Sequence, residues 1–121
     1  MIGVGPAQLD ALTAATGRAL RRRLDQWMGG TMAGWATSPA EVRSARIEAA
    51  LAAAGALGLC HEYDLALFLW LHASLGKDAE RFLAAPAVRE VAGWDAPNRG
   101  AVVAELYRLA GADVAPVAGR L

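Results

Sequence analysis

The stretch GLCHEYDLALFLWLHASLG, residues 58–76, decides the fold. It predicts a helix from about His61 to Leu75 with almost no polar face. A helix that is apolar on all sides must be covered on all sides, so we expect it at the centre of a helical bundle. Glu62 and Asp64 fall in its first turn, where carboxylates favour the positive end of the helix dipole. Gly76 is expected to end it.

The preceding helix is bounded by two recognisable signals. Ser38 is predicted to cap its start, with Glu41 completing a capping box. The helix then runs to Leu57, and Gly58 is expected to close it in the left-handed conformation, with Leu59 packing back. Its predicted inward residues are Val42, Ile47, Leu51, Ala54 and Leu57.

A long first helix is predicted from about Pro6 to Met28, where Gly29-Gly30 should end it. Beyond Gly76 the predicted elements shorten. They are helices over residues 78–84 and 86–92, and one from about 96 to 110 that Asp95 would cap. Residues 112–121 contain proline and glycine and are expected to fray.

The composition agrees with a helical reading of the whole chain. Of 121 residues, 55% are apolar and 20% are charged, which excludes a disordered chain. Alanine and leucine dominate, and β-branched residues are scarce. The sequence therefore predicts an all-α domain over residues 1–111, a compact bundle of three long helices and two or three shorter ones.

Charge and cysteine content narrow the classes of function and the cellular compartment. The 12 basic and 12 acidic residues cancel, so the basic footprint of a nucleic-acid-binding protein is missing. The longest strongly apolar run, Leu65–Leu71, is too short to span a membrane. Cys60 is the single cysteine, which fits a reducing compartment, and Met1–Pro6 lacks signal-peptide features. A cytoplasmic protein is expected.

The polar residues near the central helix do not form a recognisable catalytic motif. His61-Glu62 resembles the start of a zinc-protease helix, but the position that needs a second histidine holds Leu65. His72 lies about 16 Å further along the helix at ~1.5 Å per residue. Cys60 is adjacent to His61, yet neighbouring side chains diverge, so a structural thiol is favoured over a nucleophile. We predict no catalytic residue, no cofactor and no metal site, and hence no enzyme.

The one charge cluster contains Arg18, Arg21, Arg22 and Arg23. Helical spacing allows Arg21 to pair with Asp25. The cluster is interpreted either as a solvated helix face or as the rim of a site for an acidic protein surface.

Four tryptophans are many for this length. Trp27 and Trp70 lie on apolar stripes and are predicted to be core residues, and Trp94 a packing lid. Trp35 lies in the glycine-rich loop 29–37, where it either plugs the edge of the core or anchors a partner. Trp35, Arg18, Arg21 and Arg22 are therefore the candidate protein-binding residues.

Residues 54–71 resemble a pattern in small helical accessory proteins encoded beside bacterial type VI secretion effectors, and in the C-terminal segments of effector adaptors. The resemblance implies an accessory role in loading or holding a secreted effector or tip protein. The matching positions are interpreted as helix caps and core residues. They therefore imply a shared fold and not a shared active site. They are Gly58, Glu62, Asp64, Leu65, Phe68, Leu71 and Gly76.

The sequence thus favours a non-catalytic, adaptor-like or chaperone-like protein whose partner is another protein. Two alternatives remain open: an immunity protein that occludes a toxin, and a small helical DNA-binding regulator. The sequence also leaves open whether the chain forms a homo-oligomer.

Overall fold

The structure is a computed structural model that describes the backbone of residues 6–95 and 99–119 and the side chains of residues 17–95 and 99–119. Within those ranges the chain forms helices and no strand, which confirms the predicted all-α class. The elements are α1 (Pro6–Thr31), α2 (Ala40–Ala56), α3 (Glu62–Leu75), the 3-10 turn η1 (Gly76–Asp78), α4 (Ala79–Ala84), α5 (Pro86–Ala92), α6 (Gly100–Leu109) and α7 (Val114–Ala118).

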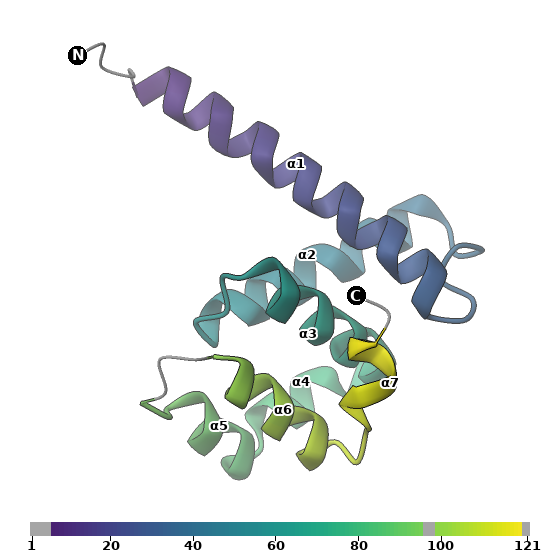
Figure 1. Cartoon of the computed structure of the whole chain (residues 1–121), viewed down its shortest axis with the longest axis vertical. Helices are drawn as coiled ribbons and strands as arrows, with labels where there is room; N and C mark the ends of the chain where they lie inside the picture. Colours follow the sequence, from purple (N-terminus) through teal and green to yellow (C-terminus); the bar gives the residue numbers. More distant parts are fainter. Residues whose placement is uncertain (1–5, 96–98, 120–121) are drawn as a thin grey trace.

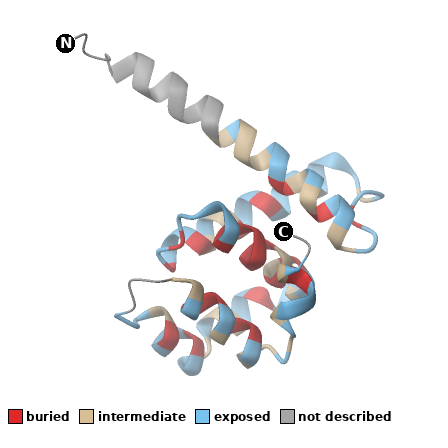
Figure 2. Ribbon diagram, in the orientation of Figure 1, coloured by how far each residue is buried: buried red, intermediate tan, exposed pale blue. Residues whose placement is uncertain are grey.

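Helix α3 lies at the centre of the molecule, as its apolar sequence predicts. Eight of its fourteen residues are buried, and it contacts α1, α2, α4, α6 and α7 (Figure 1). Buried positions gather where α2, α3, α5 and α6 face one another (Figure 2). Tyr107 of α6 reaches into this core, and its hydroxyl donates a hydrogen bond to the Leu67 carbonyl of α3. Burial raises the pKa of the Tyr107 hydroxyl above its usual value, so it remains a donor.

Helix α1 is longer than predicted, because it continues through Gly29-Gly30 to Thr31. The Thr31 hydroxyl donates to the Trp27 carbonyl, 2.7 Å away, and Leu24 and Met28 on the inner face are buried. Packing of this end against the core outweighs the helix-breaking tendency of two glycines. In Figure 1 the N-terminal half of α1 extends past the other helices.

The predicted capping box at the start of α2 is wrong. The helix begins at Ala40 with Pro39 as its N-cap, and no side chain caps it. Glu41 is consequently the second helical residue, one short of the third position that a capping box requires. The Ser38 hydroxyl donates instead to the Gly34 carbonyl, 3.1 Å away, within the preceding loop.

The end of α2 follows the prediction. Gly58 has φ +74°, and its N–H donates to Gly55 while the N–H of Leu59 donates to Ala54, at 3.1 and 3.0 Å. These two bonds define a Schellman motif, and Leu59 is buried as the motif requires.

Arg99 joins the ends of two helices. Its Nη2 donates to the Leu57 carbonyl at the end of α2 and to the Ala92 carbonyl at the end of α5. Its Nη1 donates to the Trp94 carbonyl, 2.9 Å away. Carbonyls at helix C-termini carry partial negative charge, so one guanidinium is well suited to hold them. We call this arrangement the Arg99 bracket.

Helix α6 begins later than predicted. Its first residue is Gly100 and its N-cap is Arg99, so Asp95 lies outside the helix and does not cap it. Residues 96–98, which the prediction placed in the helix, lie outside the described residues. The chain leaves α5 in a turn in which Trp94 donates to the Val91 carbonyl, so this segment serves as a connection.

The prediction of a frayed tail over residues 112–121 is wrong for residues 114–118, which form α7. The Asp113 carboxylate accepts a hydrogen bond from the Ala115 N–H and caps this helix, and Val117 is buried against the core. With α7, four short α-helices follow the three long ones in the described part of the chain, against the two or three predicted.

Trp27 and Trp70 are only half-buried, although both pack against the core. Trp70 stacks on Tyr107, with ring centroids 6.1 Å apart. The prediction that both are core residues therefore holds for their packing and not for complete burial.

Candidate protein-binding site

The structure places Trp35 in the core and not on the surface. Its side chain is 2% exposed, and its indole N–H donates to Asp25 Oδ1, 2.9 Å away. Arg43 of α2 donates to the same oxygen at 3.0 Å. The loop is thus fixed across α1 and α2, and the assignment of Trp35 as an anchor for a partner is wrong. Of the two roles that the sequence allowed, plugging the core edge is the one observed.

The arginine cluster divides into two structural pairs and two exposed residues. Arg21 pairs with Glu48 of α2 and not with Asp25, which Arg43 engages. This pairing lowers the pKa of Glu48. Arg23 pairs with Glu62, 2.6 Å apart, and so ties α1 to the start of α3.

Arg18 and Arg22 are exposed and make no ion pair with any other described residue. The four arginines therefore do not act as one patch: Arg21 and Arg23 form ion pairs with α2 and α3, and the other two form none with a described residue.

Glu62 and Asp64 also differ from simple caps. No side chain caps the first turn of α3 by hydrogen bonding. Glu62 accepts hydrogen bonds from Arg23, and Asp64 is buried, with 6% of its surface exposed. Both carboxylates nevertheless lie in the first turn, where the helix dipole favours them. Gly76 ends α3 with φ +56°, as expected.

The residues that could support catalysis are not assembled. Cys60 is exposed, and His61 lies at the start of α3 while His72 lies near its end. Within residues 17–95 and 99–119, no three His, Cys, Asp or Glu side chains are grouped so as to hold a metal ion.

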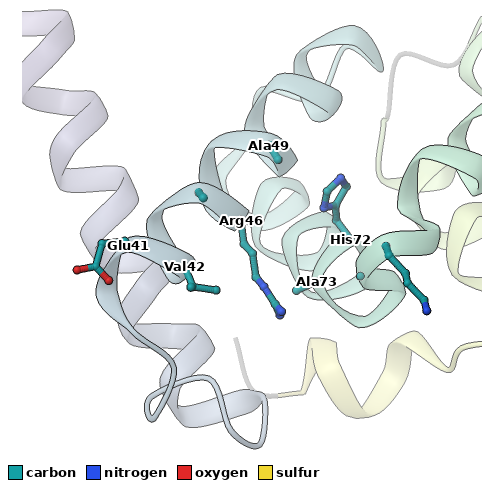
Figure 3. Close-up of a pocket in the computed structure, with 9 residues that line it drawn as sticks. Glu41, Val42, Arg46, Ala49, His72 and Ala73 are labelled. Atoms are coloured by element: carbon teal, nitrogen blue, oxygen red, sulfur yellow. The ribbon is translucent and has the colours of Figure 1, made fainter.

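A groove of about 530 Å³ lies between the N-terminal half of α2 and the C-terminal end of α3 (Figure 3). We call it the α2–α3 groove. Its surface is mainly apolar and built from small side chains, with four polar side chains among them. The lining residues are Glu41, Val42, Ala45, Arg46, Ala49, His72, Ala73, Gly76 and Lys77.

The groove exists because small residues face one another across two helices. Ala45 and Ala49 of α2 and Ala73 of α3 line the groove with no more than a methyl group each, and Gly76, which ends α3, adds no side chain. Val42 lies at one end and is 40% exposed, although the sequence predicted it to point inward. An exposed valine in an alanine-lined groove presents apolar surface that a partner can bury.

The charges around the groove are unbalanced. Arg46 and Lys77 are exposed, and neither forms an ion pair with a described residue. Burial lowers the pKa of His72 from its ordinary value near 6.5, so the imidazole is neutral at pH 7. Its ring packs against Phe68, with centroids 5.8 Å apart. Glu41 supplies the one carboxylate, so two cations and one anion border an apolar floor.

A second apolar stripe in the sequence could have revealed this site. Ile47, Ala50 and Ala54 form the buried face of α2. Val42, Ala45 and Ala49 form another at the same helical spacing, and these three residues are exposed. Two apolar stripes on one helix exceed what a single core contact requires.

Comparisons of the chain with protein-family models, with characterised proteins and with solved structures yield no match. Of the helices that the structure describes, none combines the length and the apolar character that crossing a bilayer demands.

Proposed function

We propose that this chain is a non-catalytic adaptor-like protein that binds another protein, and that it receives part of that protein in the α2–α3 groove. The groove is the observation that carries the proposal. It offers concave, mainly apolar surface bordered by charged residues, which is the usual composition of a protein-binding groove.

The resemblance of residues 54–71 to accessory proteins of type VI secretion suggests the class of partner. That partner would be a secreted effector or a tip component, bound in the cytoplasm before export. The proposed site differs from that of the sequence hypothesis. Trp35 and Arg21 are engaged within the fold, and Arg18 and Arg22 lie on α1, away from the residues that line the groove. The groove therefore replaces all four residues as the proposed site.

Co-expression with a secreted protein encoded beside this chain tests the proposal. We expect a stoichiometric complex on size-exclusion chromatography. Ala49→Arg should abolish the complex, since it places a long charged side chain in the groove. Ala104→Arg on the exposed face of α6 is the matched control and should leave the complex intact. The same elution profile with and without the partner, or equal binding by both variants, would exclude this function.

A further inference from the structure

A second hollow lies along the same helix. It has a volume of about 350 Å³ and lies between the C-terminal half of α2, α4 and α5. We call it the α2–α5 hollow. Like the first groove it is mainly apolar, and it carries one cation. Its lining residues are Ala53, Ala56, Leu57, Leu83, Val88, Arg89 and Ala92.

The two hollows open on the same face of α2. The lining positions 42, 45, 49, 53 and 56 recur at steps of three and four residues, which places them on one side of a helix. The opposite wall passes from the end of α3 to α4 and α5. Residues 42 to 56 span about 21 Å at ~1.5 Å per residue. The face is therefore long enough for about four turns of a second helix.

We infer that the occupant of this face is one amphipathic helix of the partner protein, with acidic residues beside its apolar stripe. The inference rests on the proposed function and specifies its ligand. The helix presents large apolar side chains, such as leucine or phenylalanine, to both hollows. The α2 residues that line the two hollows are centred near positions 45 and 55, about ten residues apart. The matching side chains are therefore about three turns, or eleven residues, apart in the partner helix.

A helix fits this face better than an extended peptide. Strand addition needs unpaired backbone groups at a sheet edge, and the described chain contains no strand. Proline-rich segments bind grooves lined by aromatic side chains, whereas the apolar side chains that line these hollows are alanine, valine and leucine. Alanine walls permit close approach of a second helix and leave space for its larger side chains.

The charges select an acidic helix. Arg46, Lys77 and Arg89 border the two hollows, and none forms an ion pair with another described residue. Among the described residues that line the two hollows, Glu41 is the single carboxylate. Three cations against one anion attract carboxylates and disfavour a basic helix.

Selection from a displayed library of 15-residue helical peptides against the full chain tests the inference. We expect enriched peptides to carry two large apolar residues about eleven positions apart and glutamate or aspartate at the flanking positions. Enrichment of basic peptides, or of peptides without this spacing, would overturn it.

The affinity of one enriched peptide for charge-reversal variants then separates the effect of the cations at the rim from the effect of net charge. Arg46→Glu combined with Lys77→Glu should weaken binding about tenfold or more, because it reverses the attraction at the rim. Arg18→Glu combined with Arg22→Glu makes the same charge change on α1 and should leave the affinity within about twofold. Equal effects of both pairs would show that only net charge matters and would overturn the site.

Size-exclusion chromatography with light scattering distinguishes a second copy as the occupant. A dimer that Ala49→Arg dissociates would assign the face to self-association and overturn the inference. If the native complex forms but resists Ala49→Arg, the adaptor role survives and this site fails. If the peptide binds as expected but no native complex forms, the site stands and the adaptor role fails.

Discussion

Arg99 donates to three carbonyls: that of Leu57 at the end of α2, that of Ala92 at the end of α5, and that of Trp94 just beyond it. A planar guanidinium can serve several acceptors at once, whereas an ammonium group acts as a point charge. This residue therefore tests how strongly one side chain stabilises the fold.

We expect Arg99→Ala to lower the free energy of unfolding by about 2–3 kcal/mol, because hydrogen bonds to a charged donor each contribute about 1.5–3 kcal/mol and several acceptors are lost together. Arg99→Lys should recover only part of that loss. Urea unfolding followed by circular dichroism measures both. Arg18→Ala is the control and should change stability by less than about 0.5 kcal/mol. A wild-type midpoint for Arg99→Ala would show that water replaces the bracket at no loss.

His72 predicts a dependence of stability on pH. Burial lowers its pKa in the folded chain, so the unfolded chain takes up a proton more readily. The stabilising effect of the neutral imidazole is complete above the unfolded pKa and is lost as pH falls through the folded pKa. We therefore expect stability to fall between about pH 7 and pH 5.

Replacing the histidine tests this dependence. His72→Gln should flatten the fall of the urea midpoint between those pH values. The paired carboxylates of Glu48 and Glu105 also have lowered pKa values and should retain a slope at more acidic pH. An unchanged profile in the variant would assign the whole slope to the carboxylates.

At the scale of the element, two glycines near the end of α2 have opposite roles. Gly58 has φ +74°, a conformation that is unfavourable for any residue with a Cβ. Gly55 lies within the helix, has an ordinary φ, and would accommodate a Cβ with no atom within 4 Å.

We expect Gly58→Ala to destabilise the chain by about 1–2 kcal/mol, and Gly55→Ala to stabilise it by about 0.5–1 kcal/mol through a less flexible unfolded state. The two variants make the same chemical change three residues apart, and thermal unfolding compares them directly. Changes of equal sign would contradict the Schellman assignment.

Sequence patterns predicted the elements well where apolar spacing or backbone geometry decides the outcome. The central position of α3, the start of α5 at Pro86 and the closure of α2 at Gly58 are of this kind. The sequence patterns failed to predict helix boundaries that are set by long-range packing. Helix α1 passes through Gly29-Gly30 because Leu24 and Met28 on its inner face are buried, and α6 starts after the bracket that Arg99 forms.

At the scale of the whole molecule, the candidate site was not predictable from single residues. Trp35 and Arg21 have the chemistry of interface residues, but both have partners inside the fold that lie at least ten positions away in sequence. Conversely, Ala45 and Ala49 have no chemistry that draws attention. The stripe that they form with Val42 was the one signal available in the sequence, and the assembled fold adds that Gly76, at the end of α3, lines the same groove.

The Arg99 bracket also has a thermodynamic consequence for recognition. By holding the end of α2 to the end of α5, it fixes the width of the α2–α5 hollow before any ligand arrives. A receptor that is rigid in advance loses little conformational entropy on association. The ordering required for binding therefore falls mainly on the incoming helix, whose own tendency to be helical in isolation sets how tightly it is held.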